Sequence, residues 1–271
     1  MSPVYLKNRY SILAALLLLM LCLASAPAEG KDNGASPASA GVPILLYHRF
    51  GPVVSDSMTV TTPVFESHLQ YLRDRGFSII PLKQLVDHCL GKESSLPQRS
   101  VVIVVDDAHK TVYTDMIPLV KKYRIPMTLF VYPSAISNAS YAMTWGQLKE
   151  VSTIGLVDIQ SHTYWHPNFR VDKKKLGPSE YAVFVDTQLK KSKRVLENEL
   201  KGRVDMLAWP FGIYDDELMK KARESGYRAA FSIERRHAST ADNAMALPRY
   251  LLNDRDRVKD FGKILANPSQ G

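Results

Sequence analysis

Two groups of acids and imidazoles follow two strand-like segments of the sequence. Asp106 and Asp107 come directly after a run of five β-branched residues, and His162 and His166 follow a second strand-like run. One carboxylate and two imidazoles form a three-ligand set for a divalent metal and leave a coordination position open for water. Taken singly, each group also has a structural interpretation, as a helix cap or as surface or core histidines. Their placement at two strand ends favours a metal-dependent hydrolase.

The elements that must position these residues alternate between strand and helix patterns. Such alternation predicts parallel strands joined by right-handed crossovers. The sequence predicts strands at 44–47, 77–80, 100–105, 127–132, 157–161, 204–208, 227–232 and 246–251, and helices at 62–76, 82–90, 111–123, 144–155, 178–200, 215–225 and 257–266. No Gly-rich dinucleotide fingerprint or phosphate loop occurs, so we expect an α/β barrel rather than an open doubly wound sheet. Sites in such folds open at the carboxyl ends of the strands.

The first residues have the pattern of a secretory signal. Lys7 and Arg9 precede an apolar stretch, and small residues follow it. The stretch is shorter than the ~20 residues of a spanning helix, so we predict a cleaved signal peptide over 1–28, with an uncleaved anchor as the alternative. Residues 29–41 form a flexible linker and 42–271 a single domain. We therefore expect an exported protein, periplasmic or extracellular, with a membrane contact only through this N-terminal signal or anchor.

The charge and cysteine content narrow the classes of partner. The chain carries a net charge of +8, of which the predicted signal contributes two, so +6 remains. A positive net charge would favour binding to an anionic envelope polymer, but it is equally compatible with a protein that has no charged partner. No basic run is interleaved with aromatics, so no nucleic-acid surface is expected. Beyond the signal Cys89 is the only cysteine, which excludes an intramolecular disulfide and a Cys-based zinc site. We expect a monomer.

Taken together, these residues resemble the polysaccharide deacetylase family, the carbohydrate esterases that share the NodB homology domain. The motifs are Val105-Asp106-Asp107-Ala108, His162-Thr163-Tyr164-Trp165-His166 and Trp209-Pro210-Phe211-Gly212. Leu46-Tyr47-His48 and Leu247-Pro248-Arg249-Tyr250 are similar to motifs of the branch that deacetylates exopolysaccharides such as poly-β-1,6-N-acetylglucosamine. The resemblance covers nearly all of 42–266 and implies a distorted (β/α) barrel of about seven parallel strands.

The resemblance also implies a role for each candidate residue. Asp107, His162 and His166 would hold a divalent metal, with Zn²⁺ expected first and Co²⁺, Ni²⁺ or Fe²⁺ as alternatives. Asp106 would be the general base. The residues expected to bind substrate or line the pocket are His48, Trp209, Pro210, Phe211 and Arg249.

The sequence departs from the family pattern at three places. Ala108 stands where the family usually has Gly, and Trp209 precedes Pro210 where an Arg that positions the base is usual. The late Leu-x-Leu-x-His motif, which supplies a catalytic acid in many members, is absent, and its region holds Arg249 and Asp254. The proton donor is therefore open: Asp106 could return its proton, or His48 or His109 could donate one, unless these histidines are purely structural.

The expected function is a secreted metal-dependent deacetylase that hydrolyses N-acetyl groups of a polysaccharide containing N-acetylglucosamine. Thr163 stands where a helical zinc protease would carry its Glu, and no Gly-x-Ser-x-Gly elbow for a serine esterase occurs. Two alternatives stay open, an O-acetyl glycan esterase and a catalytically impaired relative that binds carbohydrate. The missing Arg and late His motivate the second of these.

Overall fold

The computed structural model of the chain describes residues 41–93 and 95–266. The predicted signal peptide and nearly all of the predicted linker lie outside the described residues. None of the helices within these ranges combines the length and the apolar character that a membrane span requires.

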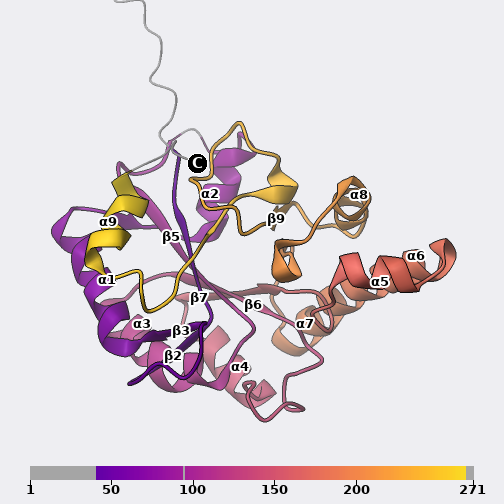
Figure 1. Cartoon of the computed structure of the whole chain (residues 1–271), viewed down its shortest axis with the longest axis horizontal. Helices are drawn as coiled ribbons and strands as arrows, with labels where there is room; N and C mark the ends of the chain where they lie inside the picture. Colours follow the sequence, from indigo (N-terminus) through magenta and orange to yellow (C-terminus); the bar gives the residue numbers. More distant parts are fainter. Residues whose placement is uncertain (1–40, 94, 267–271) are drawn as a thin grey trace, which may run out of the picture. The chain divides into compact units, whose positions relative to one another are not determined.

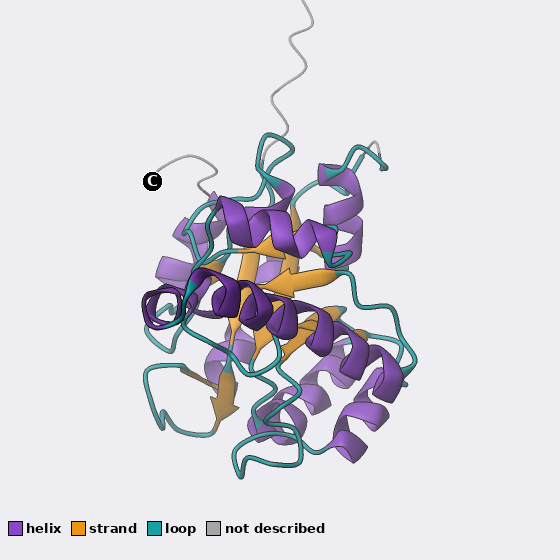
Figure 2. Cartoon of the chain, turned by 90° about the vertical axis from the view of Figure 1, so that its right-hand side faces the viewer, coloured by secondary structure: helices purple, strands orange, loops and turns teal. Residues whose placement is uncertain are grey.

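A curled sheet of parallel strands forms the centre of the fold, in the order β10-β1-β5-β6-β7-β8-β9, and β4 pairs with β5 beside this path. The strands are β1 (Ile44–Tyr47), β4 (Ser78–Ile79), β5 (Ser100–Asp106), β6 (Met127–Val131), β7 (Val157–Ser161), β8 (Met206–Ala208), β9 (Ala229–Phe231) and β10 (Tyr250–Leu251). Helices surround the strands in both views (Figures 1 and 2). Because β5 is covered on both faces, all seven of its residues are buried, which explains its continuous β-branched run.

The chain near Leu247 brings the two edges of the sheet together. Leu247 forms a parallel bridge with Phe231 of β9, and the Ser232 N–H donates to the Leu247 carbonyl at 2.9 Å. Three residues later Tyr250 pairs with Leu45 of β1. The segment 247–251 therefore spans from the last strand of the sheet to the first, and the fold is the predicted distorted (β/α) barrel.

The helices cover the outside of the barrel. They are α1 (Thr62–Asp74), α2 (Leu82–Cys89), α3 (Ile117–Tyr123), α4 (Trp145–Ser152), α5 (Phe169–Lys175), α6 (Pro178–Asp186), α7 (Ser192–Leu200), α8 (Asp216–Glu224) and α9 (Val258–Ala266), with π-helical segments η1 (Val112–Met116) and η2 (Thr187–Lys191) and 3₁₀ turns η3 (Pro210–Gly212) and η4 (Ala244–Ala246). The last helix, α9, lies beside α1 (Figure 1), where Phe261 stacks on His68 with ring centroids 4.0 Å apart.

Most of these elements match the sequence prediction to within one to three residues at each end. Helix α4 begins with a capping box, in which the Gln147 N–H donates to Thr144 Oγ1 and the Thr144 N–H donates to Gln147 Oε1. The N-cap of α1 is Thr61. Helix α5 and a short sheet of β2 (Arg49–Gly51) and β3 (Thr59–Thr61) were not predicted from the sequence.

Candidate active site

The two acids lie where β5 ends. Asp106 is the last residue of the strand, and Asp107 and Ala108 take left-handed backbone conformations with φ of 74° and 53°. Neighbours within a strand point to opposite faces, so this turn is what lets both carboxylates approach one imidazole. His162 Nε2 lies 3.6 Å from Asp106 Oδ2 and 3.6 Å from Asp107 Oδ1. Ala108 adopts the positive φ that Gly would adopt more readily, which costs about 1 kcal/mol.

The two imidazoles come from the turn that follows β7. His162 Nδ1 donates to the Ala208 carbonyl at 2.8 Å, because a carbonyl can only accept, and Nε2 is then left with its lone pair toward the acids. Thr163 and His166 have positive φ, and the His166 N–H donates to Thr163 Oγ1 at 3.2 Å. This tight turn brings His166 Nε2 to 3.8 Å from Asp107 Oδ1.

Asp107, His162 and His166 fit a divalent metal. Their donor atoms all lie within 4.8 Å of one another. Asp107 Oδ1 is buried and has no hydrogen-bond partner among the described residues. Burial lowers the pKa of His162 to about 3 and also lowers that of His166, so both imidazoles are neutral ligands at neutral pH. The structure thus brings together the three residues that the sequence predicted as a set.

Asp107, His162 and His166 are called the donor set below. Asp106 is not part of this set and is held by a guanidinium instead. Arg249 donates from Nη1 to Oδ1 at 2.9 Å and from Nη2 to Oδ2 at 3.0 Å, and its Nε donates to the Ser232 carbonyl. The arginine is fully buried. Burial alone would raise the pKa of Asp106, but the positive charge of Arg249 outweighs it and lowers the pKa to about 2. Asp106 is therefore an ionised carboxylate in a fixed orientation.

Arg249 thus orients Asp106, a role for which the family usually has an arginine directly ahead of Pro210. Arg249 was expected in the pocket, but its bond to Asp106 was not foreseen. Its position in the segment 247–251, which closes the barrel, explains how it reaches β5. The only sequence signal was the late Leu-Pro-Arg-Tyr motif.

His48 also faces this group of residues, and His109 does not contact the acids. His48 follows β1, is buried, and has an Nδ1 without a hydrogen-bond partner among the described residues. Burial lowers its pKa, whereas the charges of Asp106 and Asp107 act to raise it. Burial and the charge of Arg49 lower the pKa of His109, whose Nδ1 lies 2.8 Å from Thr111 Oγ1.

The Trp-Pro-Phe motif divides between the core and the site. Trp209 is fully buried, its indole N–H donates to the Met245 carbonyl at 2.9 Å, and its ring packs on Phe169. Pro210 is buried as well. These two residues therefore offer no surface to a ligand, contrary to the expectation from the sequence. Phe211 is 56% exposed, and its ring centroid lies 4.6 Å from that of His166.

One residue of the site was missed. Tyr132 follows β6, and its ring lies 5.3 Å from that of His166 and 6.3 Å from that of His162. Its hydroxyl is 2.8 Å from that of Tyr141. The sequence did indicate this position, because Tyr132 was predicted to end a parallel strand. The carboxyl ends of parallel strands lie together at one end of the barrel.

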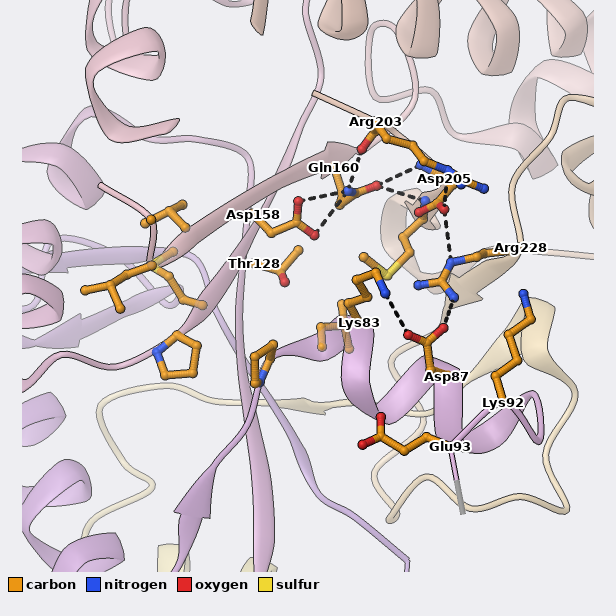
Figure 3. Close-up of a pocket in the computed structure, with 18 residues that line it drawn as sticks. Lys83, Asp87, Lys92, Glu93, Thr128, Asp158, Gln160, Arg203, Asp205 and Arg228 are labelled. Atoms are coloured by element: carbon orange, nitrogen blue, oxygen red, sulfur yellow. Dashed lines mark hydrogen bonds and ion pairs between the residues drawn. The ribbon is translucent and has the colours of Figure 1, made fainter. Parts of the chain in front are cut away.

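A separate cavity of about 770 Å³ lies at the opposite, amino ends of β6, β7 and β8. Figure 3 shows a chain of charges along it, in which Lys83 and Arg228 both contact Asp87 and Arg228 continues to Asp205. Within the cavity, Gln160 Oε1 accepts hydrogen bonds from the backbone N–H groups of Asp205 and Met206.

Comparisons with known proteins agree with this fold and place the chain in a family. The sequence profile of the family described as Polysaccharide deacetylase matches residues 93–230, and the chain belongs to this family. It is 27% identical over 201 residues to the poly-beta-1,6-N-acetyl-D-glucosamine N-deacetylase of Staphylococcus aureus, a match that covers 72% of this chain and 68% of the relative. His48 and Arg249 lie outside the matched span of the family profile.

Two solved structures share the fold. The deacetylase PplD of Streptococcus pyogenes, in complex with acetate, superposes with a TM-score of 0.73 at 23% identity and covers 83% of this chain and 98% of its own. IcaB from Ammonifex degensii gives a TM-score of 0.70 at 23% identity, with 84% and 96% covered.

Proposed function

We propose that this chain is an exported, metal-dependent N-deacetylase that acts on a polysaccharide containing N-acetylglucosamine. The observation that carries the proposal is the set of Asp107, His162 and His166 directly beside the paired Asp106 and Arg249. The named substrate of the Staphylococcus aureus relative supports a β-1,6-linked polymer as the first candidate. Export rests on the signal pattern of residues 1–28.

The donor set would hold the metal, with Zn²⁺ as the first candidate. A divalent metal bound there acts as a Lewis acid on the acetyl carbonyl and on water. The lack of cysteine ligands and the mixed imidazole and carboxylate donors also suit Co²⁺, Ni²⁺ or Fe²⁺.

Asp106 acts as the general base in this proposal. Its carboxylate starts ionised and is oriented by Arg249, so it can take a proton from water without first losing one. The same low pKa makes protonated Asp106 a strong acid, which readily returns the proton to the departing amine. As the family resemblance implies, we assign the backbone N–H of Phe211 to the oxyanion, and the Phe211 ring lies against His166.

His48 is the alternative proton donor, because it is buried next to both acids. Replacing His48 with Asn tests this choice. If Asp106 alone moves the proton, kcat changes by less than about tenfold, whereas loss of a dedicated acid lowers kcat by about 10² or more. Circular dichroism of the variant checks that it folds.

The central experiment is acetate release from a panel of glycans by metal-stripped and metal-restored protein. We expect release from N-acetylglucosamine oligomers that returns with added Zn²⁺, Co²⁺ or Ni²⁺. Release only from O-acetylated xylan would show an O-acetyl esterase instead. Glycan binding with no release under any metal would show a carbohydrate-binding relative, although the intact pair of Asp106 and Arg249 speaks against lost catalysis.

A further inference from the structure

Tyr141 stands on a loop that is tied to the turn carrying Asp107. The Lys110 N–H donates to the Tyr141 carbonyl at 2.7 Å, and the Met143 N–H donates to the Ala108 carbonyl at 3.0 Å. His109 and Ala142 form an antiparallel bridge between these two bonds. The backbone of Tyr141 is therefore fixed relative to the acids, as a rigid element of the site rather than a free loop.

The side chain of Tyr141 is held from two sides and still exposed. Its hydroxyl lies 2.8 Å from that of Tyr132, and its ring is nearly parallel to that of His109, at an interplanar angle of 8°. Nevertheless 41% of the residue is accessible. The Tyr141 side chain is therefore held in place while part of its surface stays accessible.

Two exposed aromatic residues, Tyr141 and Phe211, are each connected to His166, one indirectly and one directly. Phe211 contacts the His166 ring directly, and Tyr141 is linked to it through Tyr132. Both outer aromatics are exposed, whereas His162 is buried and Asp107 and His166 are partly buried. Tyr141 and Phe211 therefore offer exposed aromatic surface that is connected to the candidate metal ligands.

We propose that Tyr141 is a carbohydrate platform on which a pyranose ring stacks, next to the sugar whose N-acetyl group is hydrolysed. The inference rests on the proposed function and extends it to the recognition of the polymer. A pyranose presents a face of C–H groups that suits an aromatic ring, and a Tyr side chain with few rotatable bonds loses little entropy on binding. Because Tyr132 fixes its hydroxyl, the ring is oriented before the glycan arrives.

Steady-state kinetics on two substrates tests this platform. The substrates are a defined β-1,6-linked N-acetylglucosamine oligomer and the small ester p-nitrophenyl acetate, which has no sugar ring. In Tyr141→Ala we expect the oligomer KM to rise about 3- to 10-fold. The ratio of kcat/KM for the oligomer to kcat/KM for the ester should fall by a similar factor, and this ratio cancels any general loss of folded enzyme.

Two further variants control for structure. Tyr141→Phe keeps the ring and loses only the hydroxyl bond, so it should restore most of the oligomer preference. Tyr123→Ala removes a tyrosine at the end of α3, whose hydroxyl donates to Glu66 at 2.9 Å, and should leave the substrate ratio at the wild-type value. A wild-type ratio in Tyr141→Ala would overturn the platform.

Calorimetric binding of the oligomer to metal-free protein separates this inference from the proposed function. Weaker binding by Tyr141→Ala supports the platform even if the wild-type protein releases no acetate, in which case only the proposed function fails. If the wild-type protein deacetylates the oligomer but Tyr141→Ala binds and turns it over equally well, the platform fails and the function stands.

Discussion

Charged side chains gather at both ends of the sheet, and they are compensated in different ways. At the amino ends of the strands, Arg228 contacts both Asp87 and Asp205, and Asp87 has a second partner in Lys83. At the carboxyl ends Asp106 has Arg249, but Asp107 has a buried oxygen without any hydrogen-bond partner among the described residues. One end is a network of ion pairs, and the other leaves an acid among neutral imidazoles.

The difference separates a structural use of charge from a functional one. Ion pairs at the rim of the 770 Å³ cavity offset their own burial, so stability alone accounts for them. A carboxylate with one buried oxygen that lacks a hydrogen-bond partner is costly, and folding gives no reason to keep it. Such a group is a candidate for ligand binding, and the two imidazoles around Asp107 suit the metal proposed above.

The largest effect should follow from removing a donor at the carboxyl end. His162→Ala or Asp107→Asn should lower metal affinity by more than about a hundredfold, since even changes outside the coordinating residues cost up to that much. Acetate release should disappear with the metal. Elemental analysis after dialysis measures the occupancy, and full occupancy in these variants would refute the donor set.

Next in size is the loss of the base. Asp106→Asn should retain the metal, because Asp106 is bonded to Arg249 and not required in the donor set, yet kcat should fall by about 10² to 10⁴. Parallel measurements of metal content and turnover in Asp106→Asn and Asp107→Asn test the division of roles. Identical metal content in the two variants would show that the roles are wrongly divided.

Breaking one ion pair at each end compares the two regions directly. Arg249→Met leaves the Asp106 charge buried and should lower the free energy of unfolding by about 3 to 5 kcal/mol. The double variant Asp106→Asn, Arg249→Met should recover most of that loss.

Arg228→Met at the amino end should cost only about 1 kcal/mol, because Asp87 is partly exposed and keeps Lys83 as a partner, and the buried Asp205 keeps Arg203. Urea denaturation measures all three variants. Equal losses of unfolding free energy in Arg249→Met and Arg228→Met would contradict a difference between the two ends of the sheet.

The smallest effect concerns Asp158 at the amino end. Desolvation at the cavity raises its pKa, the hydrogen bond from Gln160 opposes this and the charge of Asp205 adds to it, although the residue is itself exposed to solvent. Asp158 forms no ion pair within the described ranges. A raised pKa means that the folded state binds more protons near pH 4, so ionisation of Asp158 reduces stability as the pH rises through that region. Asp158→Asn should therefore stabilise the protein by about 0.5 kcal/mol or less at pH 7 and have no benefit at pH 3. Lower stability of the variant at pH 7 would contradict this sign.

Local patterns were enough to predict most strands and the donor set. The run before Asp106 and the turn from His162 to His166 are each contiguous, so periodicity and residue type carry the information. Parallel topology then brings the two strand ends together without further knowledge. The helix α5 was missed because Phe169 is its only buried residue, and no apolar repeat marks it.

The contacts that the sequence could not reveal join distant segments. The bond between Arg249 and Asp106 spans 143 positions and depends on where the chain crosses between β9 and β1. Trp209 was expected to line the pocket because it belongs to the Trp-Pro-Phe motif. Its ring instead packs against Phe169 in the core, a contact between distant segments that the motif does not encode. The link between Tyr132 and Tyr141 depends on a loop whose course no pattern encodes.

The late position of Arg249 has a consequence for when the molecule becomes active. The acids are synthesised first, and their counter-charge emerges 143 residues later, on the segment whose pairing with β1 completes the barrel. Until that segment docks, Asp106 lies beside Asp107 without the guanidinium that keeps it ionised. A nascent chain therefore lacks the ordered carboxylate, and the proposed base is assembled only when the last strand is in place.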